Sequence, residues 1–483
     1  MPKLLFVVLS VLLFVAPMAA AAGYRDDVPE NLRSLVSKSD YDGRLRRLTN
    51  AGGDLLSKAA IRKAAASPCG ASLTKFVEAY VSDSAVADAL DAVVAGLRTP
   101  PAYNGTANPW SVAASGEELL QVLIKELTAW GPWLPQIVGD QDNGLLYIQK
   151  FLWLYYRNPA GVAFVQGRNP LNESQSLTAG FDLFNEFAAE RGEFLDSPAS
   201  TKYVEQWFND PRIEIEDYQK QKISEYVSWN DFFSRQIIVD KASQTIPSRP
   251  VTMPDRDYII SAPTDCIVNS LVQVLVEDGK VNRRFVENPL EFDMVLDVKS
   301  IPISLSDLLD GVPEKYRTPF VGGSGLSCIL MPNTYHHYHT PVTGTVVHAA
   351  VLDQYGTWGY DDVPNWISRG GDIGRPGVDF SQFSSFQRGV VIIEVEYANV
   401  PGATPSTLKG YVASIPVGLN TVGSVVLDAD IKPGKKVKRG YTRIGSFYYG
   451  GSLNILLFSK GMVSPAVQSR MGNQIAIIDI GSM

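Results

Sequence analysis

The amino-acid sequence predicts an α+β protein, with a helical N-terminal region followed by a β-rich domain. From about residue 114, apolar side chains recur at three- and four-residue spacing, which is typical of amphipathic helices. After about residue 250, short runs rich in valine and isoleucine are separated by glycine and proline, which is typical of strands and turns. With 483 residues, 45% of them hydrophobic, the chain is long enough for two or three domains with buried cores.

Residues 1–22 have the architecture of a secretory signal peptide. Lys3 precedes a long apolar run, and Pro17 and a tract of alanines follow before the first acidic residue. Such a segment is removed on export, so we expect a secreted protein or one of the secretory pathway. The alternative is an uncleaved membrane anchor, because the uncharged run approaches the length that spans a bilayer.

Residues 23–225 are expected to form a helical N-terminal domain. Residues 23–110 mix short helical patterns with loops and predict little else. The later part contains three segments of helical periodicity separated by glycine and proline. These segments are SGEELLQVLIKELTAW, GLLYIQKFLWLYY and GFDLFNEFAAERGEFL.

Residues 226–483 are expected to form the β-rich domain. Its predicted strands lie in short runs of β-branched residues. These runs are YIISAP (258–263), CIVNSLVQVLVE (266–277), TGTVVHAAVL (343–352), GVVIIEVEYANV (389–400), KGYVASIPVG (409–418), VGSVVLDADI (422–431) and LNILLFSKG (453–461).

Charge and cysteine content argue against several classes of protein. The net charge of -8 disfavours nucleic acid as the main partner. Three cysteines, Cys69, Cys266 and Cys328, are too few and too scattered for a disulfide framework or a zinc site. No phosphate-binding loop is present either.

All four histidines, His336, His337, His339 and His348, lie within thirteen residues. In a strand, alternation would place His337 and His339 on one face and His336 on the other. Histidine exchanges protons near neutral pH, so the cluster favours proton transfer. We predict no metal, because no HExxH or comparable ligand spacing is present, and a purely structural cluster is the remaining alternative.

Two Gly-Gly-Ser sequences, ending at Ser324 and at Ser452, each precede an apolar run. Neither serine lies in the G-x-S-x-G elbow of a conventional serine hydrolase. The residues alone leave open whether either serine reacts or both belong to turns that lead into strands.

Six segments resemble, in order, the motifs of the phosphatidylserine decarboxylase family, over residues 226–462. The TYHHYHTPVTGTV segment resembles the family's Tyr-His-x-x-His-x-Pro-x-x-Gly motif, and GSFYYGGSLNILLF resembles the segment at which its proenzymes cut themselves. The other four are SWNDFFSRQ with Arg249-Pro250 after it, SAPTDCIV, VKSIPISLSDLL and VGLNTVGSVVL. The helical region before them is similar to the N-terminal extension of the tryptophan-decarboxylase-like branch.

The resemblance implies that the chain cleaves itself between Gly451 and Ser452. Ser452 would attack the carbonyl of Gly451, and an acyl shift and β-elimination would turn Ser452 into a covalent pyruvoyl group at the start of a small chain, residues 452–483. This carbonyl would form an imine with the substrate amine and accept electrons during decarboxylation. The two chains would stay associated through the strand that follows Ser452. Ser324 is then interpreted as part of a turn.

The resemblance also implies roles for three further side chains. Asp265 and His339 would act as a relay that takes the proton from Ser452. His336 would handle the proton of the decarboxylation step. His337 and His348 are interpreted as structural.

The substrate implied by the resemblance is phosphatidylserine, which would be decarboxylated to phosphatidylethanolamine. The basic stretch at 432–443, KPGKKVKRGYTR, would allow a peripheral contact with an anionic membrane, although a charged hairpin leading to the cut site is the favoured interpretation. The helical extension instead favours a free aromatic L-amino acid such as tryptophan. The third alternative is an inactive relative that stays uncut.

Three positions depart from the family pattern near the reactive groups. Leu453 stands where the family has threonine after the cleavage serine, and Cys266 stands where it has glycine after the motif aspartate. Asn454 interrupts the apolar run of the last strand. None of the three removes a predicted catalytic group.

Overall fold

A computed structural model covers the chain and describes the following residues: 43–44, 66–97, 110, 119–132, 154, 158–165, 167–277, 280–286, 289–297, 302–330, 333–352, 388–397, 408–418, 425–448 and 452–462. The predicted signal peptide and both glycines before Ser452 lie outside these residues.

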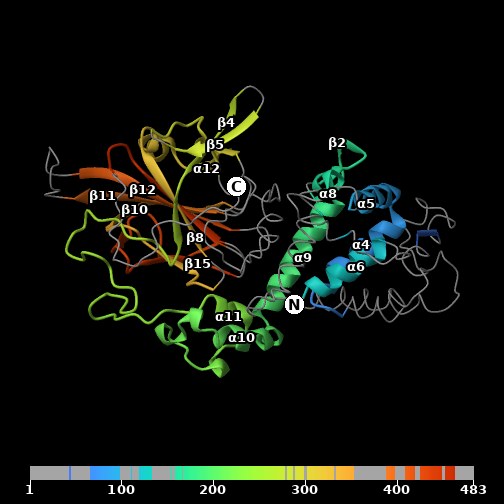
Figure 1. The fold of residues 1–483 in the computed structure, drawn as a ribbon, viewed down its shortest axis with the longest axis horizontal. Helices are drawn as coiled ribbons and strands as arrows, with labels where there is room; N and C mark the ends of the chain where they lie inside the picture. The colour runs from blue at the N-terminus through green and yellow to red at the C-terminus, as the bar shows by residue number, and fades with distance from the viewer. Residues whose placement is uncertain are drawn as a thin grey trace, which may run out of the picture. The chain divides into compact units, whose positions relative to one another are not determined.

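The chain divides into two compact units, and the predicted α+β class is confirmed (Figure 1). The first unit comprises Met1–Pro135 and Asn143–Phe194, and the second comprises Gln136–Asp142 and Leu195–Met483. The described helices of the first unit are drawn in blue to green, and the strands of the second in yellow to red.

The first unit contains helices and one small hairpin. Its described elements are α4 (Gly70–Ser82), α5 (Ser84–Gly96), α6 (Leu119–Trp130), α8 (Pro159–Val165), β1 (Arg168–Asn169), β2 (Asn172–Ser176) and α9 (Ala179–Asp196). The β1–β2 hairpin was not expected within the helical region, because its polar sequence has no strand-like alternation.

Local sequence explains how these helices begin and pack. The Asp83 carboxylate accepts hydrogen bonds from the first backbone N–H groups of α5, a standard N-cap. Apolar residues three or four apart, such as Leu73 and Phe76 on α4 and Leu90 and Val93 on α5, are buried. None of the helices in the described ranges has the length and apolar character needed to cross a bilayer.

The second unit begins with short helical turns, which lead into the sheets. They are η4 (Pro198–Tyr203), α10 (Val204–Phe208), η5 (Pro211–Ile213), η6 (Ile215–Asp217), η7 (Ile223–Glu225) and α11 (Trp229–Phe233). Trp207, Trp229 and Phe232 are buried among them and anchor this segment.

A seven-stranded antiparallel sheet forms the centre of the second unit. Its strands, in spatial order, are β14 (Lys436–Val437), β10 (Gly344–Leu352), β11 (Arg388–Tyr397), β12 (Leu408–Gly418), β16 (Ser452–Phe458), β8 (Ser324–Leu330) and β3 (Ile267–Ser270). All but one of the predicted apolar runs form strands of this or the smaller sheets. The exception is YIISAP, where the prediction is wrong: these residues form an irregular segment that begins in a turn and ends in a bend.

Two smaller sheets complete the β-structure. The three-stranded sheet has the order β13 (Val425–Leu427), β15 (Arg443–Phe447), β9 (His337–His339), and the four-stranded sheet has the order β5 (Lys280–Phe285), β4 (Val272–Glu277), β6 (Val295–Asp297), β7 (Pro302–Ser304). The short helices α12 (Leu305–Leu308), α13 (Glu314–Arg317) and η8 (Thr318–Phe320) follow β7.

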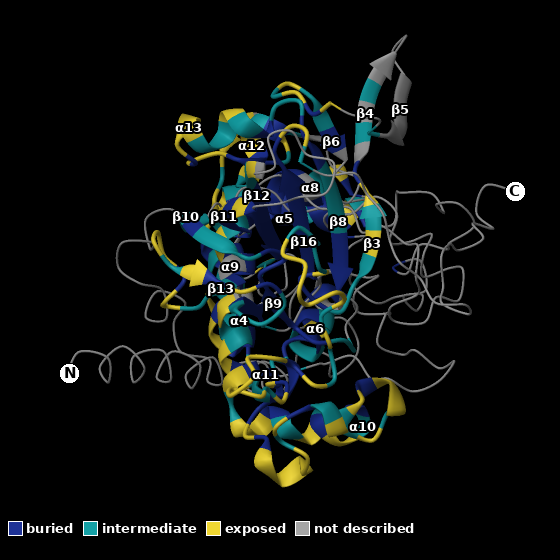
Figure 2. Cartoon of the chain, turned by 90° about the vertical axis from the view of Figure 1, so that its left-hand side faces the viewer, coloured by how far each residue is buried: buried dark blue, intermediate teal, exposed yellow. Residues whose placement is uncertain are grey.

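The seven-stranded sheet has a buried core on each face. The histidine-side core includes Tyr338, Ile444 and Phe447 of the three-stranded sheet, packed on alternate residues of the central strands such as Leu456. The opposite core joins the other alternate residues, such as Leu453, to the four-stranded sheet and the helices α12 and η8. The central strands are therefore largely buried on both faces, as Figure 2 shows, which explains their continuous hydrophobic sequences.

Candidate active site

Ser452 is the first residue of β16, in the interior of the central sheet. It pairs with Gly418 of β12 and with Leu330 of β8. Its side chain is 1% exposed, and within the described part of the chain its Oγ has no hydrogen-bond partner. Strand alternation places Ser452 on the face of Leu456, toward the histidine-side core.

The second Gly-Gly-Ser lies at the other end of the same pair of strands. Ser324 pairs with Phe458, the last residue of β16, whereas Ser452 pairs with the last residue of β8. Gly322 has φ +79° and forms the turn, but Ser324 itself is the first residue of β8, so its assignment to the turn is wrong. Ser452 lies beside Leu330, the last residue of β8, after which the chain continues to the histidine segment. Ser324 lies at the opposite end of these strands.

Three of the four histidines, His336, His337 and His339, lie on or just before β9, with the predicted alternation, whereas His348 lies on β10. Tyr338 belongs to the histidine-side core and faces the central sheet, so His337 and His339 face away from it. The His336 carbonyl accepts a hydrogen bond from the Phe447 backbone at 2.9 Å, which extends the ladder with β15 by one residue. His336 therefore faces the same side as Tyr338, toward the layer that also receives Ser452.

His336 has one free ring nitrogen. Its Nδ1 donates to the Thr334 carbonyl at 2.9 Å, and because a carbonyl only accepts, Nε2 carries the lone pair. This Nε2 has no partner among the described residues, and the side chain is fully buried. Phe233 covers the ring, with centroids 3.8 Å apart. Burial lowers the pKa of His336, so the ring is a neutral base.

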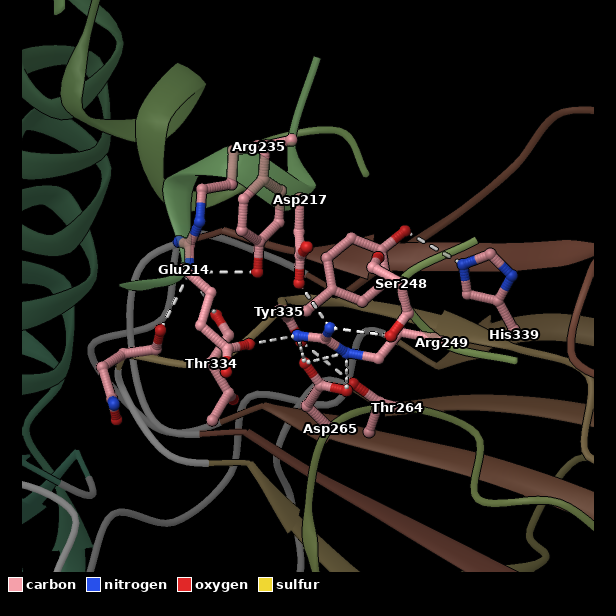
Figure 3. Close-up of polar contacts among 12 residues, drawn as sticks. Glu214, Asp217, Arg235, Ser248, Arg249, Thr264, Asp265, Thr334, Tyr335 and His339 are labelled. Atoms are coloured by element: carbon pink, nitrogen blue, oxygen red, sulfur yellow. Dashed lines mark hydrogen bonds and ion pairs between the residues drawn. The ribbon is translucent and has the colours of Figure 1, made fainter. Parts of the chain in front are cut away.

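His339 has both ring nitrogens occupied. Its Nδ1 donates to the Tyr441 carbonyl at 3.0 Å, so its Nε2 accepts from the Tyr335 hydroxyl at 2.9 Å, as Figure 3 shows. Burial lowers the pKa of His339 to about 4 and that of its neighbour His337 to about 3. His337 Nε2 donates to the Ser234 carbonyl at 2.8 Å, in agreement with a structural role.

Asp265 is held by Arg249 and forms no hydrogen bond with His339 among the described residues. Arg249 Nε contacts both Asp265 oxygens, at 2.9 and 3.1 Å, and its other nitrogens reach Asp217 at 2.5 Å and Glu214 at 2.7 Å (Figure 3). The segment before Asp265 does contact the histidine segment: the His339 backbone donates to the Pro263 carbonyl at 2.6 Å. The structure thus brings Asp265 near His339 but pairs it with an arginine.

The sequence did not predict the roles of Arg249 and Tyr335. Both belong to motif segments, Arg249-Pro250 and Tyr-His-x-x-His, so the motifs were the available signal. The contacts they make join segments far apart in the chain, which no local pattern reveals.

Two of the three departures from the family pattern, Leu453 and Asn454, fall on opposite faces of β16. Leu453 is 1% exposed and lies in the opposite core, pointing away from the layer that Ser452 faces. Asn454 is fully buried on the same face as Ser452. Cys266 packs beside the histidine-side core.

A cavity of about 580 Å³ borders His339 on the side away from the central sheet. Tyr335, His339 and Tyr441 form part of its wall, with Lys435, Lys436, Lys438 and Arg443 from the basic stretch. Lys435 pairs with Asp430 at 2.5 Å and Arg443 with Asp428 at 2.6 Å. Lys436 is exposed and makes no such contact with the described residues.

The described residues contain no group of three or more His, Cys, Asp or Glu side chains placed to hold a metal ion. A group derived from Ser452 itself would fit the site, because the buried Oγ faces a layer with unpartnered polar atoms and both neighbouring strands fix the backbone. By strand alternation Asn454 shares this face of β16, and His336 lies on the side of its segment to which Tyr338 points.

Comparison with known proteins gives a consistent result. A family model described as phosphatidylserine decarboxylase matches residues 229–477. A phosphatidylserine decarboxylase proenzyme of Clostridium perfringens is 25% identical over 67% of this chain and 86% of its own length. Decarboxylase iboD of Amanita muscaria is 26% identical over 59% of this chain and 80% of its own length. Phosphatidylserine decarboxylase proenzyme 2 of Komagataella phaffii is 23% identical over 70% of this chain and 28% of its own length.

Proposed function

The chain belongs to the phosphatidylserine decarboxylase family and is a decarboxylase, and from this premise we propose that it is a proenzyme that cleaves itself between Gly451 and Ser452. The observation that carries the proposal is Ser452 itself. It is buried at the start of a central strand, and its hydroxyl is unpartnered among the described residues. A buried hydroxyl without a partner costs folding free energy, which favours a chemical role.

The proposed cleavage is an acyl shift from nitrogen to oxygen followed by a β-elimination. Ser452 Oγ loses its proton to a base and bonds to the Gly451 carbonyl carbon, and the bond from that carbon to the Ser452 nitrogen breaks as the nitrogen takes a proton. The ester then loses the Ser452 α-proton, and the bond from Cβ to the ester oxygen breaks. The resulting dehydroalanine takes up water and releases ammonia, which leaves a pyruvoyl group on residue 452.

Two histidines are candidates for the base. The resemblance assigns the relay of Asp265 and His339, which requires Tyr335 to release His339 Nε2 and Arg249 to release Asp265. His336 needs no such rearrangement, because its Nε2 has no hydrogen-bond partner among the described residues.

The pyruvoyl group would supply an electron-withdrawing carbonyl for decarboxylation. The chain's own residues would exclude water and manage protons around it. Buried, neutral His336 would hold and return the proton that replaces the lost carboxylate. The strands beside β16 would keep the group in place.

We propose phosphatidylserine as the substrate, with phosphatidylethanolamine as the product. The family description and the names of the relatives support this choice. The cavity beside His339 adds a chemical argument, because the exposed Lys436 and Lys438 of its wall suit a phosphate-bearing headgroup and a peripheral contact with an anionic membrane, while Lys435 and Arg443 are paired with Asp430 and Asp428. Export by residues 1–22 would place the enzyme in the secretory pathway or outside the cell.

A free amino acid, such as the aromatic L-amino acid tryptophan, is the second candidate substrate. It is favoured by the similarity to decarboxylase iboD, whose name specifies no lipid substrate. This chain covers 80% of the length of that relative. The helical unit before the catalytic domain is the second argument for it.

Mass spectrometry of the purified protein tests the cleavage. We expect two chains, the smaller beginning at residue 452 with a blocked N terminus, and an intact chain for Ser452→Ala. A wild-type protein that remains full length would refute the proposal and support the inactive-relative alternative.

The substrate is tested by CO2 release from phosphatidylserine vesicles and from free tryptophan, with Ser452→Ala as the blank. Activity on vesicles alone supports the lipid substrate, and activity on tryptophan alone overturns it.

A further inference from the structure

Arg235 is a buried cation directly after α11, and the proposed function gives it no task. Its side chain is 2% exposed. In the described part of the chain its hydrogen bonds go to neutral oxygens, two backbone carbonyls and the Tyr218 hydroxyl, and not to a carboxylate. A buried charge without a carboxylate partner costs folding free energy, so its position calls for an explanation.

The contacts of Arg235 fix the backbone just before the motif histidines. Its Nη2 donates to the Thr334 carbonyl at 3.2 Å and to the Asn333 carbonyl at 2.8 Å (Figure 3). The guanidinium lies over the rings of Tyr218 and Phe232, 4.4 and 5.3 Å from their centroids, and these cation–π contacts hold it in place. The arginine thus joins two segments that are 99 residues apart in the sequence.

The Thr334 carbonyl that Arg235 contacts is also the one that orients His336. It accepts from His336 Nδ1 at 2.9 Å, so this oxygen receives a donor from each residue, as its two lone pairs allow. Phe233, two residues before Arg235, covers the imidazole ring at a centroid distance of 3.8 Å. One short segment therefore covers the His336 ring and fixes its hydrogen-bond acceptor.

The charge of Arg235 acts on the same ring. Burial first, and then the positive charge of Arg235, lower the pKa of His336, while the hydrogen bond to Thr334 opposes them. Among the described residues the other titratable group that acts on the ring is His337, and burial lowers its pKa to about 3. Near neutral pH His337 is therefore uncharged, and Arg235 is the cation that the ring meets.

We propose that Arg235 is a positioning residue for His336: it holds the Thr334 carbonyl against His336 Nδ1, so that the ring keeps one proton and presents Nε2 as a neutral base. The inference rests on the proposed function and deepens it, because it names what prepares the base. Arg235 itself neither accepts nor gives up the transferred proton.

Nitrogen-15 NMR of histidine-labelled protein tests the inference without any turnover. All samples carry Ser452→Ala and stay uncut, and His336→Gln identifies the His336 signals among those of four histidines. In Ser452→Ala we expect a neutral ring with its proton on Nδ1. Adding Arg235→Met removes the donors and the positive charge, so we expect a mixture of tautomers and a titration midpoint at higher pH. Adding Arg235→Lys keeps the charge but not the planar fork, so we expect an intermediate spectrum.

The time course of precursor cleavage, with Ser452 present, gives a second readout. We expect Arg235→Met to slow cleavage by about 10- to 10²-fold, the usual cost of removing a group that orients a reacting side chain. Arg235→Lys should recover part of the rate.

The matched control is Arg388→Met. Arg388 is 4% exposed and donates to two successive backbone carbonyls, those of Asp307 and Leu308, beside the opposite core. Losing a buried arginine should lower the melting temperature in both variants. Only Arg235→Met should alter the His336 signals and the cleavage rate, which a merely structural arginine would leave unchanged.

An unchanged His336 tautomer and titration in Arg235→Met would overturn the inference and leave the proposed function intact, and so would cleavage of this variant at the wild-type rate. If Arg235→Met does not fold, Arg235→Lys decides: a wild-type spectrum and rate would overturn the inference, and intermediate values support it. A wild-type chain that is never cut would instead refute the proposed function. The spectra distinguish the two failures, because they are recorded on uncut protein.

Discussion

The two motif histidines differ in the hydrogen bonding of Nε2. In His339 this nitrogen accepts from the Tyr335 hydroxyl, whereas in His336 it has no partner among the described residues. Both rings donate through Nδ1 to a backbone carbonyl, so the tautomers are the same. The difference therefore arises from Tyr335 and from the face of β9 on which each ring lies.

This difference predicts unequal effects on self-cleavage. We expect His336→Gln to slow precursor cleavage by at least 10²-fold, the usual contribution of a general base, and His339→Gln to slow it less. The measurement is the time course of precursor loss on gels for both variants. Tyr335→Phe is the control, since it frees His339 Nε2. Faster cleavage of Tyr335→Phe, together with a greater loss in His339→Gln, would show that His339 is the base.

Some features of the site follow from the sequence, and others cannot. Alternation alone separates His336 from His337 and His339, because a strand has a period of two. The motif order singles out Ser452 rather than Ser324. The ion pairs of Arg249 with Asp265, Asp217 and Glu214 join three segments that are far apart in the sequence. No local sequence pattern predicts such pairs.

At the scale of elements, strands were predictable where both faces are buried. β11 and β12 are continuous apolar runs because each contributes to both cores. The YIISAP segment has a similar composition but an irregular backbone. Its N–H groups donate outside any strand ladder, that of Ile259 to the Arg256 carbonyl and that of Ser261 to the Pro341 carbonyl. An apolar composition alone therefore does not make a strand, and the available backbone partners decide whether the segment becomes one.

The placement of Leu453 predicts what restoring the family's threonine would do. Leu453 lies in the opposite core, next to Ile329 and Val417 on the neighbouring strands. Leu453→Thr removes buried methyl groups and introduces a hydroxyl there, so we expect the free energy of unfolding to fall by about 2–4 kcal/mol. Because the side chain points away from Ser452, cleavage should not accelerate.

Urea unfolding of Leu453→Thr in the Ser452→Ala background, with cleavage kinetics of the single variant, checks this expectation. The matched control is Val268→Thr on β3, where the side chain is 43% exposed and little change is expected. A stable Leu453→Thr that cleaves faster would mean that residue 453 acts on the reactive serine.

At the scale of the whole molecule, the proposed cut falls at the start of β16, a strand whose residues are all buried. β16 has neighbours on both sides, with seven residue pairs to β12 and seven to β8. All its side chains are buried, and they enter both cores. Cleavage before Ser452 would break one covalent bond without removing any of these contacts, so the small chain would remain an integral strand.

The last prediction follows from this position of β16. In native buffer, residues 452–483 should co-elute with the large chain on gel filtration and separate only in denaturant. Unfolding of the cleaved protein then produces two molecules from one, so its midpoint depends on protein concentration. We expect the urea midpoint of the cleaved wild type to rise when the protein concentration is raised a hundredfold. That of intact Ser452→Ala should stay fixed, because its unfolding is unimolecular. Release of the small chain without denaturant, or equal concentration dependence in both proteins, would contradict the central place of β16 in the sheet.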